Sequence, residues 1–344
     1  MEGATTTWQF RPAKALPGLR LLLMVAVIFP LSGCYYLQAA RGQMEIMRKR
    51  EAIDDVVAAQ DTSPELSARL RVVEEARHFS VDVLGLPDNK SYRSYADLER
   101  DFVIWNIIAV PEFSLQPKSW CYPVVGCVSY RGYFSQETAQ DKADNLRAEG
   151  YDVAFGGVAA YSTLGKFNDP VLNTMMHWSD TDLVAVMFHE LAHQVLYVKN
   201  DTGFNESFAT AVEEIGMERW LASRQQPDVL SEWRARRELN SKFSSLVAAA
   251  RSDLDGIYGA SIDDQQKRMR KRARLLSLAS TAKKLFADAD SPAPAWLDSE
   301  LNNARLVSTT LYQGRLTEFR ALLAECGDEL ECFYSEAKKL AESI

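Results

Sequence analysis

The chain lacks three features that would each indicate a protein class: an excess of basic residues, an internal repeat and a long apolar run. Its formal net charge of −8 gives no electrostatic reason to expect a nucleic-acid partner. The absence of a fixed-period repeat argues against a solenoid or a propeller. No run reaches the ~20 apolar residues that span a bilayer. With 344 residues, 47% of them hydrophobic, the chain can build one large core or two modest ones.

The longest apolar run, Leu21–Pro30, lies near the N-terminus, with basic residues before it and the sequence LSGC after it. This layout is typical of a secretory signal, and Leu31–Cys34 resembles the bacterial lipobox. By that resemblance residues 1–33 are a signal peptide, and Cys34 carries a lipid that holds the protein on a membrane. Tyr35 rather than aspartate follows, which in Gram-negative lipoproteins implies the outer membrane, facing the periplasm. The alternative is a short membrane anchor with a chance cysteine.

Only four cysteines remain after Cys34, and they form two close pairs in the sequence: Cys121 with Cys127, and Cys326 with Cys332. An even count in an exported protein indicates disulfides, for which three connectivities exist. Closeness in the sequence favours the two local pairings. A thiolate zinc site is the competing interpretation, and the five-residue gaps without nearby histidines argue against it.

The organisation along the chain predicts an α+β fold. Residues 34–90 form an N-terminal helical segment, residues 91–180 mix strands with helices, and residues 181–344 are nearly all helical. Strands are expected at Asp101–Val110 and Tyr151–Ser162, because both stretches are rich in β-branched and aromatic residues. The fold is therefore a small upstream sheet followed by a mainly helical C-terminal part.

Local signals place several element ends. Ser63-Pro64-Glu65 reads as an N-cap, a proline in the first helical position and an acidic first turn, so a helix begins there. Ser135 can cap a helix that runs to Ala148. Gly156-Gly157, inside the second strand, favours a bulge or a close backbone approach. The basic run Lys267–Arg274 is interpreted as a solvated helix face, with contact to anionic lipid as the alternative.

Histidine is scarce, yet two of the four histidines bracket a glutamate in His189-Glu190-x-x-His193. On a helix, residues i and i+4 lie on one face, so both imidazoles can converge on one ion. Neutral imidazole is a good zinc ligand, and a catalytic zinc keeps three protein ligands and one open position. Glu190 lies beside the first ligand, where its carboxylate can accept a proton from water. The alternative is a solvated helix that carries two histidines by accident.

A third ligand is available in Glu206, thirteen residues after His193. The intervening KNDTG is a good helix stop and restart, so a second helix can return antiparallel and bring Glu206 to the metal. Glu213 shares the face of Glu206 and is a candidate to contact a ligand from behind, with Glu214 as a weaker candidate. Thr210, one turn after Glu206, can hydrogen-bond a histidine ligand and orient it. The expected cofactor is one Zn²⁺ ion.

The motifs HELAH and NESFAT together resemble the gluzincin group of zinc peptidases. That resemblance implies a zincin-like fold with the HExxH helix at the junction of its two parts. It also implies that His189, His193 and Glu206 are ligands and that Glu190 is the catalytic base. Two departures stand out: the gap before Glu206 is shorter than in the thermolysin-like and alanyl-aminopeptidase families, and the glycine-rich exopeptidase motif has no clear match.

A second resemblance covers most of residues 34–344. The stretches that carry it are PEFSLQPKSWCYPVVGCVSYRGYF, AYSTLGKFNDP, HELAHQ, NESFATAVEE and NNARLVSTTLYQGRLTEFRALL. Together they are similar to the bacterial family described as predicted aminopeptidases, which are exported and often carry a lipobox. The resemblance implies a zinc metallopeptidase domain at 91–344 that hydrolyses peptides.

Two questions stay open in the sequence. Tyr161 and Tyr312 are candidates to stabilise the oxyanion, because a phenol can donate a hydrogen bond to it, and a packed or surface tyrosine is the alternative for each. The function hypothesis is a zinc aminopeptidase. Its alternatives are a zinc endopeptidase and a non-catalytic envelope lipoprotein with a binding or structural role. The sequence gives no oligomeric state.

Overall fold

The computed structural model describes residues 35–122, 126–299, 301–310 and 315–343. The chain divides into two units, Met1–Met44 and Glu45–Ile344. In the first unit the described residues are helical. Cys34 and Tyr312, for which we predicted roles, lie outside the described residues. No helix within the described ranges combines the length and the apolar character that a membrane crossing requires.

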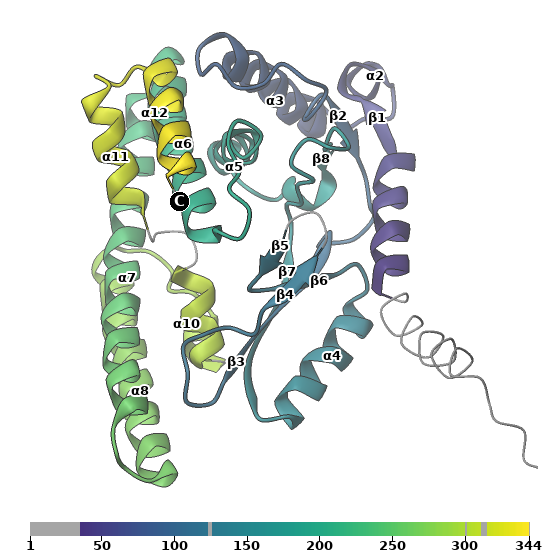
Figure 1. The fold of residues 1–344 in the computed structure, drawn as a ribbon. Coiled ribbons are helices and arrows are strands. Elements are labelled where there is room, and N and C mark those ends of the chain that lie inside the picture. Colours follow the sequence, from purple (N-terminus) through teal and green to yellow (C-terminus); the bar gives the residue numbers. More distant parts are fainter. Residues whose placement is uncertain (1–34, 123–125, 300, 311–314, 344) are drawn as a thin grey trace, which may run out of the picture. The chain divides into compact units, whose positions relative to one another are not determined.

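The second unit is α+β, with short sheets and many helices (Figure 1). Its strands are β1 (Arg50–Ala52), β2 (Ser94–Ala96), β3 (Ile104–Pro111), β4 (Trp120–Tyr122), β5 (Gly126–Val128), β6 (Arg131–Tyr133), β7 (Tyr151–Val158) and β8 (Val171–Leu172). Its helices are α2 (Ile53–Ala58), α3 (Pro64–Asp82), α4 (Gln136–Ala148), the 3₁₀ turn η1 (Asn173–Met175), α5 (Asp180–Ala192), α6 (Thr202–Ser223), α7 (Pro227–Gly259), α8 (Asp264–Asp288), α9 (Trp296–Ser299), α10 (Asn303–Thr310), α11 (Leu316–Glu325) and α12 (Leu330–Glu342).

We predicted a helical segment before residue 90, and the structure has helices joined by turns there, together with the short strand β1. β1 pairs antiparallel with β2, and β2 pairs in parallel with β8. A three-residue strand of this kind is set by its partners rather than by its own propensity, which is why the sequence pattern missed it. The helix start at Ser63 is confirmed, because its hydroxyl accepts a hydrogen bond from the Leu66 N–H at 3.1 Å.

The main sheet has the order β6-β3-β7 and is antiparallel. The two strands predicted from β-branched and aromatic content are β3 and β7, and their register runs without interruption from Ile104↔Val158 to Pro111↔Tyr151. The bulge considered at Gly156-Gly157 is therefore absent. The close approach is present instead, since a Cβ on Gly157 would lie 2.2 Å from the Phe102 ring.

Helices cover both faces of this sheet, with α4 on one side and α10 on the other (Figure 1). Ile108 and Val110 of β3 pack with Ala304 and Val307 of α10. Because side chains alternate along a strand, the neighbouring buried residues of β3 face α4. Burial on both faces explains the continuous apolar run that predicted this strand. Ser135 caps α4 as predicted, and its hydroxyl accepts from the Thr138 N–H at 3.2 Å.

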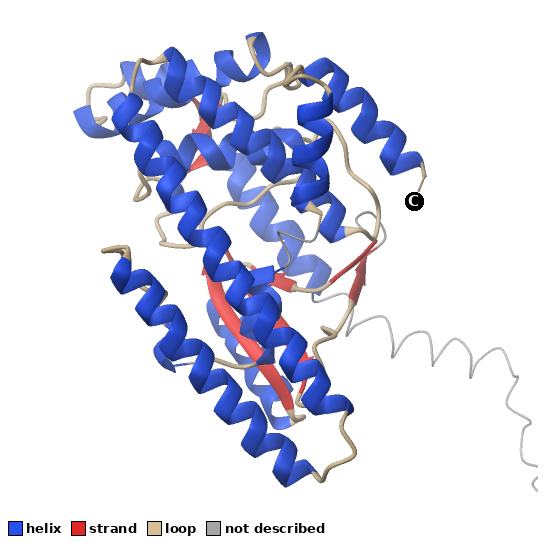
Figure 2. Cartoon of the chain, turned by 90° about the vertical axis from the view of Figure 1, so that its left-hand side faces the viewer, coloured by secondary structure: helices blue, strands red, loops and turns tan. Residues whose placement is uncertain are grey.

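Helices α7 and α8 lie side by side as a long hairpin (Figure 1 and Figure 2). They share a separate core that includes Val247, Leu254 and Leu278. The prediction that the basic run on α8 is a solvated face is wrong for Lys271, which is only 8% exposed. Its ammonium donates to Asp152 Oδ2 at 2.6 Å and to the Glu112 carbonyl at 2.9 Å, because α8 packs beside the end of β3.

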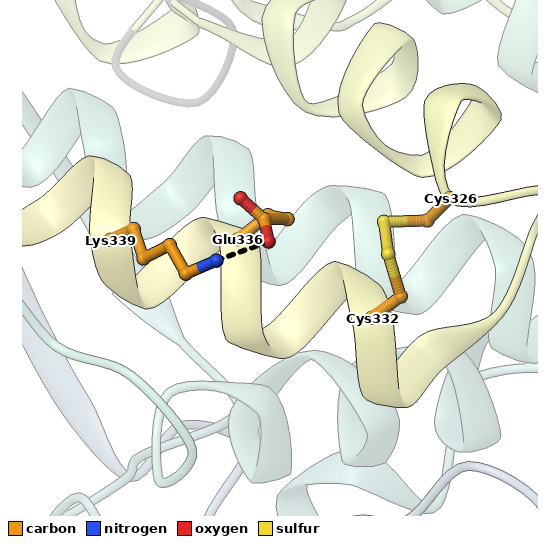
Figure 3. Close-up of a disulfide and its surroundings, with 4 residues drawn as sticks. All are labelled: Cys326, Cys332, Glu336 and Lys339. Carbon is orange, nitrogen blue, oxygen red and sulfur yellow. Dashed lines mark hydrogen bonds and ion pairs between the residues drawn. A yellow bond between two sulfur atoms is a disulfide. The ribbon is translucent and has the colours of Figure 1, made fainter.

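Two disulfides join cysteines that are close in the sequence. Cys121–Cys127 links β4 to β5, and Cys326–Cys332 links the end of α11 to the start of α12. In Figure 3 the second bridge lies one turn before the ion pair between Lys339 and Glu336 on α12. These are the local pairings favoured by the sequence. Each bridge restricts the unfolded chain next to a short turn.

Candidate metal centre

The candidate site lies between α5 and α6, which pack closely against each other. Ser179 begins α5 by accepting a hydrogen bond from the Asp182 N–H at 3.1 Å, and Asp201 begins α6 by accepting from the Phe204 N–H at 2.9 Å. Gly216 permits the close packing, because a Cβ there would lie 2.9 Å from both a Leu84 and a Phe188 side-chain carbon. Phe188 directly precedes His189, so its contact with Gly216 fixes the position of the first histidine along α6.

Asn205 holds the connection between the two helices. This residue is 2% exposed. Its Oδ1 accepts from the Val198 N–H at 2.7 Å, and its Nδ2 donates to the Val198 carbonyl at 2.8 Å. The side chain thereby satisfies both backbone groups of a residue in the loop, as a strand neighbour would. The asparagine before Glu206 therefore has a structural role, because it fixes the start of the helix that carries the glutamate.

The turn geometry brings His189, His193 and Glu206 together. Nε2 of His189 lies 3.2 Å from Glu206 Oε2, and Nε2 of His193 lies 3.8 Å from Glu206 Oε1. Within the described residues these three form the one group of His, Cys, Asp or Glu side chains able to hold a metal ion, with ligand atoms within 4.8 Å of one another.

The three side chains lie close enough together to hold one ion. With zinc–ligand distances of about 2.0–2.1 Å, the ligand atoms of a tetrahedron lie about 3.3–3.4 Å apart. The contacts at 3.2 and 3.8 Å are made to different oxygens of Glu206, and the three candidate ligand atoms lie within 4.8 Å of one another. Two imidazoles and one carboxylate also match the donor set of a catalytic site that keeps one position open. The residues present therefore fit zinc in their donor chemistry, and they lie close enough together to hold one ion.

Glu213 contacts the first histidine from behind. Its Oε2 lies 3.1 Å from Nδ1 of His189, the ring nitrogen opposite to the one near Glu206. Thr210 is buried on the same helix, and its hydroxyl makes no hydrogen bond to either histidine in the described part of the chain. The longer side chain of Glu213, three residues further on, reaches the ring instead. Glu214 is directed to arginines rather than to a histidine.

Titration of the metal-free histidines reflects these contacts. Burial alone would lower the pKa of His189, but hydrogen bonds to Glu206 and Glu213 outweigh it and raise the pKa to about 10. Burial and the charge of His189 lower the pKa of His193 to about 4, against the opposing charge of Glu206. Without a metal ion, His189 is therefore protonated between the carboxylates of Glu206 and Glu213, and His193 is neutral.

Glu190 lies in a buried environment beside the ligands. Burial raises its pKa to about 7, and the charge of Glu206 adds to this rise. The charge of His189 and a hydrogen bond from Ser162 act in the opposite direction. A carboxyl with a pKa near neutrality can both accept and return a proton.

Sequence reasoning missed the groups around Glu190. Asp169 is 2% exposed and accepts hydrogen bonds from the Ser162 hydroxyl at 3.3 Å and the Thr163 N–H at 2.8 Å. Its carbonyl accepts from the Tyr92 N–H at 2.7 Å. Ser162, Thr163 and Asp169 all lie in the stretch AYSTLGKFNDP, whose resemblance to the family was the one available signal for them.

Tyr92 had no signal in the sequence. It is 3% exposed and has a φ of 60°, which is rare for an aromatic residue and marks backbone strain. Burial raises its pKa well above the usual value, and the charges of Glu190 and Asp169 add to that rise. The buried Arg77 of α3 holds the preceding loop by donating to the Ser91 carbonyl at 2.9 Å. The N-terminal helices thus contribute to the surroundings of Glu190.

The two tyrosines considered as oxyanion donors stay predictions. The ring of Tyr161 packs edge-to-face on Phe134 at 5.6 Å between ring centroids. Tyr312 lies in the stretch that the structure does not describe. Of the remaining histidines, His177 packs edge-to-face against Trp178 at 5.8 Å between ring centroids.

Comparison with known proteins gives one result, and it extends over most of the chain. The family model described as "Putative aminopeptidase" matches residues 34–344. No curated protein and no solved structure matches the chain. The match includes the HExxH helix, Glu206 and every element of the second unit. Because it extends over most of the sequence, this chain belongs to the family described as putative aminopeptidases.

Proposed function

We propose that the protein is a zinc-dependent peptidase whose ligands are His189, His193 and Glu206. The observation that carries the proposal is the convergence of these three side chains, at 3.2 and 3.8 Å, next to Glu190. The family description supports peptide hydrolysis in general. A zinc ion held there would act as a Lewis acid that lowers the pKa of water towards about 7 and polarises the scissile carbonyl.

Glu190 is the general base in this proposal. Its carboxylate can take a proton from the attacking water and later deliver that proton to the departing amine. Ser162 lies within hydrogen-bonding reach of this carboxyl. Because its hydroxyl has one proton, Ser162 can donate either to Glu190 or to the buried Asp169, whose Oδ2 lies 3.3 Å away.

The substrate is an extended peptide in a zincin-like fold. β7 is the edge strand of the main sheet, and a peptide can add to such an edge through main-chain hydrogen bonds. Part of that edge is already used: the Val153 carbonyl accepts from Asn302 at 3.1 Å, and the Phe155 carbonyl accepts from Arg305 at 2.8 Å. The peptide is therefore expected at the C-terminal end of β7, around Gly157.

Cleavage of single N-terminal residues is the first form of this activity, in line with the family description. One observation favours the endopeptidase alternative. An aminopeptidase needs a carboxylate for the substrate amine, and the two acidic residues Glu213, behind His189, and Glu214, beside it in the sequence, are both engaged by Arg237. We further propose that Cys34 carries a lipid and that the protein faces the periplasm from the outer membrane.

The test uses the detergent-solubilised full chain, loaded with zinc and mixed with paired peptides that differ only in N-terminal acetylation. Mass spectrometry reads the products. Stepwise loss of single residues from free peptides alone identifies an aminopeptidase, and internal cuts in both members identify an endopeptidase. Glu190→Gln should keep zinc and lose at least about 10²-fold in turnover, because general base catalysis contributes that much. Full turnover in this variant would refute the mechanism.

A further inference from the structure

Behind His189 lies a cation that the peptidase proposal does not use. Arg237 of α7 has its Nη1 3.1 Å from Glu213 Oε1, and its Nη2 donates to Glu214 Oε1 at 2.9 Å. The other oxygen of Glu213, Oε2, lies 3.1 Å from Nδ1 of His189. The guanidinium is therefore two contacts away from His189, a proposed ligand.

A second arginine, from helix α11, also binds the Glu214 carboxylate. Arg320 of α11 donates to both oxygens of Glu214, at 2.8 and 2.7 Å. Burial would raise the pKa of Glu214, but the hydrogen bonds and charges of Arg320 and Arg237 outweigh it and bring the pKa below its usual value. Glu214 thus stays ionised and fixes one side of Arg237, which leaves the other side of the guanidinium for Glu213.

The exposure of these side chains separates them from an ordinary surface ion pair. Glu213 and Glu214 are 13% and 17% exposed, and Arg237 is 29% exposed. Exposed pairs contribute little because water and salt screen them, whereas partly buried pairs are screened less. A guanidinium also presents its donors in a rigid planar fork. Arg237 can therefore hold two neighbouring carboxylates in fixed directions at once.

Only one of the two histidines has a described hydrogen-bond partner at Nδ1, the ring nitrogen that faces away from the proposed metal ion. Nδ1 of His189 has Glu213 as its partner. Nδ1 of His193 is buried and has no hydrogen-bond partner among the residues that the structure describes. The direction of the Glu213 carboxylate is therefore the contact through which the surrounding protein can set the angle of a ligand ring.

We propose that Arg237 is a positioning residue of the metal centre. It holds the Glu213 carboxylate in place, and Glu213 turns the His189 ring so that Nε2 faces the metal ion. The inference rests on the proposed zinc site, but it does not depend on which bond the enzyme cleaves. It also means that α7, which carries no ligand, contributes to metal affinity.

The experiment compares zinc binding by the full chain with that of Arg237→Met, Glu213→Gln and a matched control, Arg234→Met. Arg234 also lies on α7 and pairs with a glutamate of α6, Glu218, which has no contact with the proposed ligands in the described part of the chain. Zinc affinity is measured by competition with a chromophoric chelator. The visible absorption of the Co²⁺-substituted protein reports ligand geometry, and the melting temperature of the metal-free protein reports the fold.

Arg237→Met and Glu213→Gln should each weaken zinc binding by about 10- to 100-fold and alter the Co²⁺ spectrum. Arg234→Met should change neither, and its metal-free melting temperature should be at least as high as that of Arg237→Met, which loses a less exposed ion pair. The double variant Arg237→Met/Glu213→Gln should bind no more weakly than Glu213→Gln, because both changes act on one contact.

Wild-type zinc affinity in Arg237→Met would overturn the proposal, as would additive losses in the double variant. Should Arg237→Met fail to fold, Arg237→Lys decides: an ammonium cannot hold both carboxylates with a fixed fork, so unchanged affinity in that variant also overturns the proposal. A wild-type chain that binds zinc but cleaves no peptide would refute the peptidase and leave this inference standing. A wild-type chain that binds no zinc would refute both.

Discussion

Replacing Asn205 by alanine tests whether the loop between the two helices that carry the proposed ligands depends on a single side chain. The asparagine makes two hydrogen bonds to the backbone of Val198, at 2.7 and 2.8 Å, and is 2% exposed. Truncation removes both bonds and leaves the Val198 N–H without its partner, whereas the Val198 carbonyl keeps a longer bond from the Asp201 N–H at 3.4 Å. No other described side chain replaces them.

The expected loss follows from these contacts. Two net hydrogen bonds are worth about 0.5–1.5 kcal/mol each, and an unsatisfied buried group adds about 1–3 kcal/mol. Val198 is only partly buried, so water can satisfy some of what is lost, and the lower end of the range applies. We expect Asn205→Ala to lower the free energy of unfolding by about 2–3 kcal/mol, a large share of the usual total. Zinc binding should weaken as well, since Glu206 is the next residue.

Urea unfolding of the metal-free protein measures the first effect without a contribution from zinc, and a competing chelator measures the second. Asn240→Ala, on the exposed face of α7, is the control and should stay within about 0.5 kcal/mol of wild type. An Asn205→Ala protein as stable as this control, with unchanged zinc affinity, would show that the connection holds itself in place.

Two further predictions concern protons and buried charge. Zinc affinity should rise by about tenfold per pH unit between pH 6 and 8, because the metal displaces one proton from His189, whose pKa is raised to about 10, while His193, with a pKa lowered to about 4, is already neutral. Competition titrations at three pH values check this, and a flat profile would contradict it. Lys271→Met should destabilise the protein by about 2–3 kcal/mol, because it leaves the partly buried Asp152 carboxylate without its cation. Its control on the same helix, the exposed Lys283→Met, should cost at most about 1 kcal/mol, and equal losses in denaturant unfolding would show that burial of the pair does not matter.

Sequence reasoning succeeded where the information is local. The caps at Ser63 and Ser135 are each decided within a few residues, and the structure has both. The same holds for β3, whose apolar run reflects burial on two faces. The spacing of His189, His193 and Glu206 also contained enough geometry to predict that they meet, because helix periodicity and one turn fix it.

Sequence reasoning failed where the position of a residue depends on contacts with residues far away in the sequence. β1 depends on β2, more than forty residues later. Lys271 looked like part of a solvated run, yet it is buried against Asp152 from another element. Tyr92 lies near Glu190 through a loop that Arg77 holds. Each of these placements is set by tertiary packing, which neither propensity nor a short motif contains.

The contacts of α10 with the outer edge of β7 also bear on aggregation. An unprotected edge strand is a template on which another chain can build a continuous sheet. Here Asn302 and Arg305 occupy the carbonyls of Val153 and Phe155. The part of β7 beyond Phe155 spans only Gly156–Val158, which is long enough to hold a few residues of one peptide but too short to nucleate a growing sheet. An edge that could bind a peptide is therefore still protected from pairing with strands of other protein molecules, even when the protein is concentrated.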